Sequence, residues 1–385
     1  MVKLRTREKC YIYLWLSVFI YFLAVSVFSN QLFRFAVLIP AMLVLFVVGI
    51  SKISMWEMKD LLSLISILFI LCVGFVYGHV VSSFVHWKTT LFFVTQLCAI
   101  VLCSKGRVTK KTFDWIFFFA ILIAITFAII SFFPLVHKVT TDERVYYTIY
   151  YAFNLSNSNL AGMFLLCIFM VLLINLKFRK HKYMLSALIA FVGYMLYKTN
   201  ARSCILAGIV ILFFYFFFKK KIPRFIIWSC MAIPLAFPVI YNWLLSSFDE
   251  NFVFLGKTFF SGREHVFEAY LSKMDTWLHY LVGNFGEFSF QNAHNGPLAV
   301  YAATGVIGVL LTYGFYWRAI IRINSNETGI STLCVACLLG IFIQSSAEAA
   351  VLLGSFPLVV FISTIFLLAN YKEPICTTNV VEVQK

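Results

Sequence analysis

Residues 159–218 read NLAGMFLLCIFMVLLINLKFRKHKYMLSALIAFVGYMLYKTNARSCILAGIVILFFYFFF, and this stretch decides the fold class. Three apolar runs, at about 159–177, 183–199 and 203–218, follow one another with only short connections that carry lysine and arginine. A transmembrane helix needs about 20 mainly apolar residues, with a range of about 17–25. Three such runs in close succession predict a chain that crosses a membrane repeatedly.

The whole chain has the same composition. Its 385 residues are 62% hydrophobic and 12% charged, whereas soluble domains have about 25% charged residues. We therefore expect a single integral membrane domain over residues 1–385, with no separate soluble domain. A net charge of +15 would suggest nucleic acid in a soluble protein. Here the basic residues form short clusters between apolar runs, so we expect topology signals and no nucleic-acid partner.

The length criterion, applied to the whole chain, predicts an all-α fold with about 12 transmembrane helices. The weakest candidates are the fourth, which is short, and the eleventh, which ends in the polar Ser345-Ser346-Ala347-Glu348. The candidate spans are roughly 10–29, 33–50, 61–80, 89–104, 113–134, 159–177, 183–199, 203–218, 225–247, 297–317, 331–350 and 354–370.

The distribution of basic residues predicts the orientation of these spans. If the N-terminus lies inside, most of the 31 lysines and arginines fall in segments on the inner side, as the positive-inside rule requires. Both termini then face the cytoplasm. Three segments face outwards: about 135–159, the tight turn at 198–203, and the large loop at 248–296.

Two basic residues lie on the outer side, where few are expected. Lys198 and Arg202 are four residues apart, one helical turn, at the outer ends of the seventh and eighth spans. Each could simply extend to the lipid headgroups. Arginine also presents a planar fork of donors that suits phosphate oxygens, and Arg202 precedes a span that would bury its stem. We therefore interpret Arg202 as a candidate for binding a lipid diphosphate.

The large loop contains a second arginine, Arg263, at the predicted start of a helix. Ser261 fits an N-cap with Glu264 at the third helical position, and apolar residues from Val266 to Leu281 follow helical spacing. This pattern predicts one amphipathic helix on the outer membrane surface. The helix could serve only as a lipid anchor. The glycine before Arg263 would also place backbone donors beside the guanidinium, which favours binding of an anion.

His294 is the strongest single candidate for catalysis. It precedes Gly296-Pro297, which opens the tenth span. An imidazole with a pKa near about 6.5 can take a proton from a sugar hydroxyl at neutral pH. The alternative is a structural role, in which His294 caps the span or bonds a backbone carbonyl. The sequence lacks two histidines one turn apart with a glutamate, the pattern that would suggest zinc, so we expect neither a metal nor a cofactor.

Three other residues on or near the outer side have weaker signals. Glu348, near the outer end of the eleventh span, could orient His294, pair with an arginine, or be an ordinary loop acid. Arg144 lies in the first outward segment and is a possible supporting residue, as is Lys198. Gly305 and Gly308, within the tenth span, are interpreted as positions of close helix packing.

At these residues the chain resembles the O-antigen polymerase and O-antigen ligase superfamily of bacterial envelope enzymes. The resemblance covers roughly residues 157–348, and the first five spans match only as spans. The matching motifs are His294-Asn295 followed by Gly305-Val306-Ile307-Gly308, Thr199-Asn200-Ala201-Arg202-Ser203, Ser261-Gly262-Arg263 and, more weakly, Asn157-Ser158-Asn159-Leu160-Ala161.

The resemblance implies a GT-C-like glycosyltransferase of the bacterial plasma (inner) membrane that needs no metal or cofactor. Its site would face the periplasm or the exterior, and its donor and acceptor would be oligosaccharides linked to undecaprenyl diphosphate. Arg202 and Arg263 would hold the diphosphate, and His294 would act as the base in an inverting transfer. Asn295 and Glu348 would support them, and a chain-length regulator protein is a further partner that the resemblance allows.

Within this family the sequence favours a polymerase. The outer loop, with Phe288-Ser289-Phe290-Gln291 where a longer connection would be typical, is shorter than many ligases carry. A ligase would instead transfer the glycan to lipid A-core. Outside the family, a transporter of lipid-linked oligosaccharides would place ionisable residues inside the membrane, whereas these spans are almost free of charge. A non-enzymatic scaffold in an envelope complex is the remaining alternative.

Overall fold

The computed structural model describes residues 6–26, 36–37, 39–45, 47, 56–77, 84–105, 108–132, 137–139, 149–151, 155, 158–177, 182–248, 253–254, 257–258, 263–284, 293–353 and 357–371. This part of the chain is almost entirely helical, which confirms the expected all-α class. The long helices are α1 (Thr6–Ser26), α3 (Met58–Tyr77), α4 (Phe84–Ser104), α5 (Lys110–Ser131), α6 (Ser158–Leu176), α7 (Lys182–Lys198), α8 (Arg202–Phe217), α9 (Arg224–Ser247), α12 (Gly296–Asn324), α13 (Gly329–Gln344) and α15 (Leu358–Leu368).

The remaining elements are short. Three further helices are α10 (Arg263–Ser272), α11 (Trp277–Val282) and α14 (Ala350–Leu353), and the described residues between 36 and 47 are helical as well. Two antiparallel pairs of short strands lie within the segments expected to face outwards, β1 (His137–Val139) with β2 (Ile149–Tyr151) and β3 (Val253–Phe254) with β4 (Lys257–Thr258). Within the described residues, each predicted span other than the second overlaps one long helix. The second candidate, 33–50, lies partly outside the described residues.

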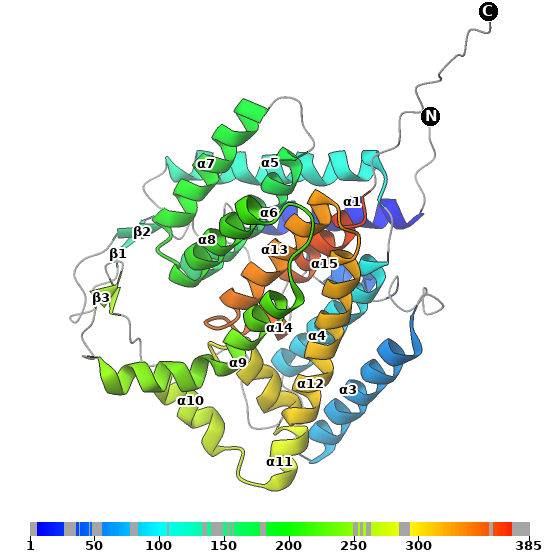
Figure 1. Ribbon diagram of the computed structural model, residues 1–385, viewed down its shortest axis with the longest axis vertical. Helices are drawn as coiled ribbons and strands as arrows, with labels where there is room; N and C mark the ends of the chain where they lie inside the picture. Colours follow the sequence, from blue (N-terminus) through cyan, green and yellow to red (C-terminus); the bar gives the residue numbers. More distant parts are fainter. Residues whose placement is uncertain are drawn as a thin grey trace, which may run out of the picture.

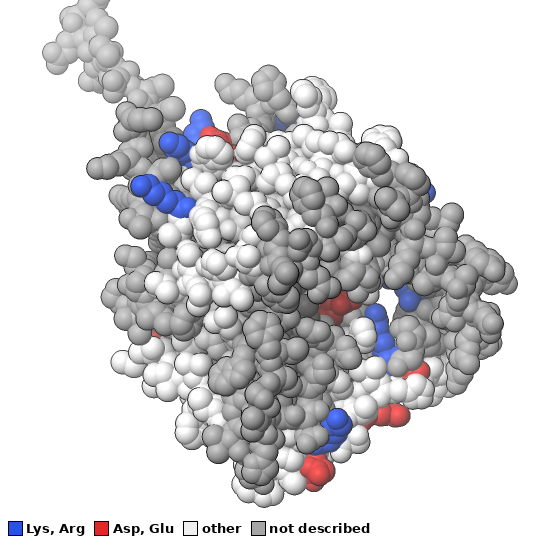
Figure 2. All heavy atoms as spheres, turned by 180° about the vertical axis from the view of Figure 1, so that it is seen from behind, with Lys and Arg blue, Asp and Glu red and all other residues white. Residues whose placement is uncertain are grey.

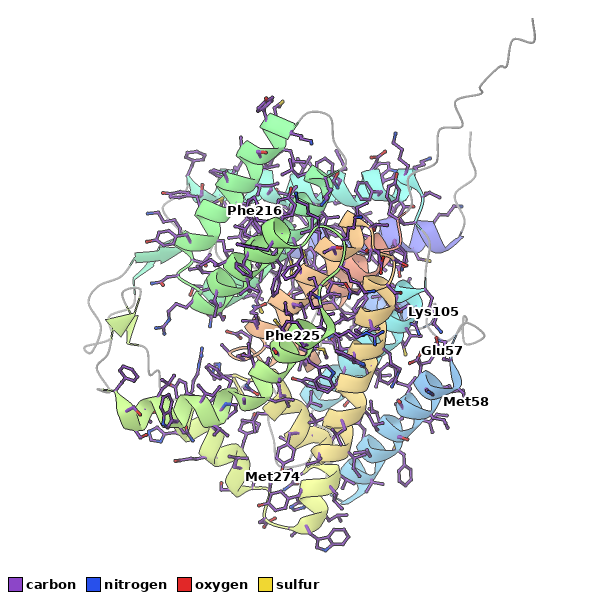
Figure 3. The ribbon with its side chains drawn as sticks, viewed as in Figure 1. Glu57, Met58, Lys105, Phe216, Phe225 and Met274 are labelled. Carbon is purple, nitrogen blue, oxygen red and sulfur yellow. The ribbon has the colours of Figure 1, made fainter. Side chains whose placement is uncertain are left out.

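The helices have the length and surface of a membrane-embedded protein. Among the described residues, α5, α6, α9 and α12 are long and apolar enough to cross a membrane, and α8, α13, α15 and large parts of α1 and α4 are shorter apolar helices. Large apolar side chains also lie on the outside: Met58, Phe216 and Phe225 are 68%, 68% and 70% exposed (Figure 3). A large apolar surface is unfavourable in water and matches a lipid environment.

Two helices form the centre of the bundle. Nearly every residue of α6 and α13 is buried, and α13 lies against α8, α9, α12 and α15 (Figure 1). The approach of α8 to α13 depends on Gly340, because a Cβ there would lie 2.6 Å from the Ile211 side chain. The N-terminus of α13 is fixed by a capping box, in which Thr328 and Ser331 each accept from the other's backbone N–H.

One end of the bundle is held by ion pairs, and we call it the basic end. Asp60, in the first turn of α3, is buried and accepts a 2.8 Å hydrogen bond from Arg318 Nε on α12. Glu57 accepts a 2.6 Å bond from Arg322 Nη2 on the same helix and lies 3.2 Å from Lys105 Nζ at the end of α4 (Figure 3). The C-terminal part of α12 therefore joins the start of α3 and the end of α4.

The opposite end of α12 lies among other helix ends, and we call it the site end. The Gly296 N–H, at the start of α12, donates to the Ser345 carbonyl just after α13, at 2.7 Å. The start of α6 meets the turn between α7 and α8, because a Cβ on Gly162 would lie 2.5 Å from the Ala201 Cβ. The two pairs of connections also meet, because the Gln344 side chain at the end of α13 donates to Cys204 Sγ in the first turn of α8 at 3.1 Å, so all four lie at one end of the bundle.

The structure corrects one prediction made from spacing and adds to another. The single amphipathic helix expected from Arg263 to about Leu281 is two helices, α10 and α11, because Thr276 caps a new helix by accepting from the His279 N–H at 3.1 Å. Gly305 is a position of close helix packing, as expected, but it also interrupts its helix. Its φ of 63° and ψ of −169° break α12, and a Cβ there would lie 2.2 Å from the Leu281 carbonyl group.

The eleventh span is shorter than expected. The sequence predicted a span over 331–350, but α13 ends at Gln344, and Ser345 to Ala347 form a turn. The serine hydroxyl of Ser345 bonds the Phe342 carbonyl at 2.6 Å, which supplies a local end to the helix. This places Glu348 in a connection outside α13.

Candidate functional site

Asn295 is the structural anchor of the site end. It is fully buried and caps α12, since its Oδ1 accepts from the Leu298 N–H at 2.8 Å. Its Nδ2 donates to the carbonyls of Pro234 and Ser346, at 3.0 and 3.1 Å. The Pro234 carbonyl needs this donor, because its usual helical partner four residues later is Pro238, which has no N–H. One side chain therefore joins α9, α12 and the end of α13.

His294 is held immediately before this anchor. Its φ of 47° is in the left-handed region, which is uncommon for a residue other than glycine, and its neighbours Ala293 and Asn295 are both fully buried. Burial lowers the pKa of the His294 imidazole from its ordinary value, and the charge of Arg263 lowers it further. The imidazole is therefore neutral at pH 7, the form that can accept a proton.

Arg202 is presented by a tight turn between two helices. Asn200 ends α7 in the left-handed conformation that asparagine tolerates, with a φ of 51°. The Ala201 N–H donates to the buried Thr199 hydroxyl at 3.2 Å, and α8 begins at Arg202. This turn packs against the start of α6 at Gly162. The arginine consequently lies at the site end, half-buried at the first position of its helix.

Arg263 begins α10, which is fixed on the bundle by aromatic packing. Phe267 of α10 and Tyr241 of α9 are both buried, and their rings meet edge to face with centroids 5.7 Å apart. Tyr270 and Met274 are also buried, and their helical spacing from Phe267 places them on the same side of α10 and the following turn. Arg263 is thus positioned by a packed helix.

Arg263 is the residue that links the separate parts of the site. Its charge acts on Arg202 at the start of α8, on His294 before α12, and on Glu348 in the turn after α13. Coulomb interactions weaken with distance and are screened by water and salt, so the groups that act on one another in this way lie near one another. Two guanidinium groups, one imidazole and one carboxyl group from four connections therefore lie together at the site end.

Glu348 is the acidic member of this group. The Asn159 side chain, in the first turn of α6, lies near the carboxyl group and acts to lower its pKa. The Oε1 atom is buried and has no hydrogen-bond partner among the described residues. Burial raises the pKa of Glu348 to about 7, although Arg263 and Asn159 act in the opposite direction. Glu348 therefore exchanges its proton near neutral pH, as carboxyl groups of functional sites often do.

The other sequence candidates have different positions. The Lys198 ammonium lies 5.5 Å from the ring centre of Tyr194, on its own helix α7, and among the described residues no interaction joins it to Arg263. Arg144 and the expected N-cap Ser261 lie outside the described residues, as does the loop segment 288–291. Asn295 is present at the site, but its hydrogen bonds are those of a structural residue.

Three residues at the site were not predicted to take part. Ser346 lies in the turn with Glu348 and is buried, with an Oγ that has no partner in the described part of the chain. Tyr241 acts electrostatically on Arg202. Asn159 belongs to the weakest of the matching motifs, and no role at the site was expected for it. Side-chain type gave no signal for these residues, because their roles depend on which helices meet.

Charged groups are also visible on the outside of the molecule. The face seen in Figure 2 is hollowed on its right side, and both acidic and basic side chains lie in the hollow.

Within the described residues no group of three or more histidine, cysteine or acidic side chains could hold a metal ion. No protein-family model matches the chain, and no curated protein sequence matches it.

Proposed function

We propose that this protein is a polysaccharide polymerase that joins repeat units linked to undecaprenyl diphosphate, on the outer side of a bacterial plasma membrane. The observation that carries the proposal is the common electrostatic neighbourhood of Arg202, Arg263 and His294 at one end of the bundle. The residues that the motif resemblance would assign to the donor and to the base are therefore neighbours, although they are up to 92 positions apart.

The two ends of the bundle support the proposed orientation. Lys105, Arg318 and Arg322, all assigned to inner segments by the positive-inside rule, lie at the basic end. The site residues lie at the other end of α12. A twelve-span topology with both termini in the cytoplasm would therefore place the site on the outer side, where lipid-linked repeat units are joined.

In the proposed reaction, the acceptor hydroxyl oxygen attacks the anomeric carbon of the donor sugar. The bond from that carbon to the diphosphate oxygen breaks, and the configuration inverts. His294, neutral because burial and Arg263 lower its pKa, takes the hydroxyl proton. The guanidinium groups of Arg202 and Arg263 stabilise the charge that develops on the leaving undecaprenyl diphosphate. No step requires a metal ion or a cofactor.

The test in cells is complementation of a deletion strain. The variants Arg202→Ala, Arg263→Ala and His294→Ala should each lose long-chain glycan while the protein remains in the membrane at normal amounts. Loss of a general base typically lowers the rate by about 10²–10⁴-fold, enough to remove a ladder of chain lengths. His265→Ala is the matched control, because His265 is 82% exposed on the same helix as Arg263. Normal chain lengths from all three variants would refute the proposal.

The same strain separates the alternatives. Loss of a polymerase leaves single repeats attached to lipid A-core, whereas loss of a ligase leaves none attached and lipid-linked polymer accumulates. A transporter would move lipid-linked oligosaccharide across liposomes without joining two glycans. A scaffold would tolerate all three single substitutions and fail only on larger deletions.

A further inference from the structure

The turn between α13 and α14 contains two buried oxygen atoms without hydrogen-bond partners among the described residues. They are Ser346 Oγ and Glu348 Oε1. Ser346 is 6% exposed, and the pair are two residues apart in one turn. A buried polar atom that lacks a partner is costly, and native proteins leave very few of them unless a ligand or an ion supplies the missing bond.

This turn is fixed directly beside the proposed base. The Ser346 carbonyl accepts from Asn295 Nδ2 at 3.1 Å, and the Ser345 carbonyl accepts from the Gly296 N–H at 2.7 Å. Asn295 is the residue next to His294. The position of Ser346 is therefore set by Asn295, the residue next to the proposed base, and Glu348 follows two residues later in the chain.

The available groups match a ligand that has many hydroxyl groups. A serine hydroxyl can donate and accept, and a carboxyl oxygen can accept from a sugar hydroxyl. Asn159 adds a side-chain amide from α6, which also acts on this carboxyl group. The diphosphate is an unsuitable ligand for this turn, because a carboxylate would repel it. The acceptor sugar, which must approach His294, has the required chemistry.

We propose that Ser346, Glu348 and Asn159 bind the acceptor sugar ring through its hydroxyl groups, next to His294. This inference rests on the proposed function and extends it, because it divides the site into two parts. Arg202 and Arg263 bind the diphosphate of the donor, and the α13–α14 turn binds the uncharged face of the acceptor. Substitutions in the turn should then change acceptor binding and leave donor binding unchanged.

The experiment measures the two binding steps separately with purified protein in liposomes. The probe for the acceptor is the repeat-unit oligosaccharide released from its lipid by mild acid, and the donor is the native lipid-linked repeat unit. We expect the KM for the acceptor to rise about fivefold in Ser346→Ala and about tenfold in Glu348→Gln, with the donor KM unchanged. Ser345→Ala is the control, because the Ser345 hydroxyl bonds the Phe342 carbonyl of its own helix.

A second measurement keeps this inference separate from the proposed function. Thermal stabilisation of the His294→Ala protein by the free oligosaccharide reports binding without catalysis, and adding Ser346→Ala or Glu348→Gln should weaken it. If wild-type protein makes no polymer, the proposed function fails, and this binding assay decides the inference alone. If Glu348→Gln raised the KM for the donor and left the KM for the acceptor unchanged, the inference would be overturned, and Glu348 would act with Arg263 in donor binding. Equal oligosaccharide binding by all variants would overturn it as well.

Discussion

The role of Asn295 can be tested by removing its side chain. Asn295→Ala deletes three hydrogen bonds: the cap on Leu298 and the two donations to the carbonyls of Pro234 and Ser346. Loss of an N-cap costs about 1 kcal/mol. Each buried carbonyl left without a donor costs about 1–3 kcal/mol. We therefore expect the free energy of unfolding to fall by about 3–7 kcal/mol, a large part of the about 5–15 kcal/mol that proteins have.

A double-mutant cycle identifies the carbonyl concerned. Pro238→Ala restores an N–H that can bond the Pro234 carbonyl within α9, so the amide of Asn295 becomes less important. The loss caused by Asn295→Ala should then be smaller by about 1 kcal/mol in the Pro238→Ala background. The assay is denaturant unfolding of the purified protein in detergent. Asn326→Ala, which removes an amide at the basic end, serves as the control.

Two results would contradict this reasoning. If Asn295→Ala left the free energy of unfolding unchanged but abolished glycan synthesis, Asn295 would act in the chemistry and not as an anchor. If the two substitutions were strictly additive, the bond to the Pro234 carbonyl would contribute nothing, and the joining of α9 to the start of α12 would need another explanation.

Three other substitutions test other parts of the structure. Gly305→Ala should lower the free energy of unfolding by roughly 2 kcal/mol or more. The φ of 63° at this position disfavours a residue with a Cβ, and the Cβ would also lie 2.2 Å from the Leu281 carbonyl group. Thermal unfolding of the two proteins measures the difference. Asp60→Asn should lower the free energy of unfolding by about 3 kcal/mol, because the buried carboxylate pairs with Arg318 at 2.8 Å. A urea unfolding curve identical to that of the wild type would contradict this prediction. In the folded state Glu348 has a pKa of about 7, above the ordinary 4.5, so between these pH values the folded protein binds the proton more tightly than the unfolded chain does. The free energy of unfolding should therefore fall by roughly 2–3 kcal/mol as the pH rises from 4.5 to 7. Glu348→Gln should remove that part of the pH dependence, and identical profiles for the two proteins would show that the carboxyl group is not buried as described.

The helical framework could be predicted from the sequence because hydropathy is a local property. Residues 159–218 contain three apolar runs and become α6, α7 and α8 with ends within a few residues of those expected. Two local signals were also present but were not used. Asp275-Thr276 before Trp277 is an N-cap pattern that predicts the break between α10 and α11. Asn295 before Gly296-Pro297 is a second N-cap pattern, and it predicts a structural role for Asn295.

The assembly of the site depends on contacts that sequence spacing does not contain. The partners of Arg263 come from the starts of α8 and α12 and from the end of α13, and only the packing of these helices brings them together. The break at Gly305 likewise results from the approach of α11, which fills the space that a side chain would need. Asn159 and Ser346 have side chains that are common throughout the protein, so nothing but their neighbours distinguishes them.

Polymerisation by purified components tests the central claim most directly. Wild-type protein in liposomes receives the native lipid-linked repeat unit in the presence of a metal chelator, and the products are separated by length. The account predicts a ladder of joined repeats and free undecaprenyl diphosphate from wild type and from His265→Ala, and neither from folded His294→Ala. A ladder of equal yield from His294→Ala, or none from correctly folded wild-type protein, would contradict it.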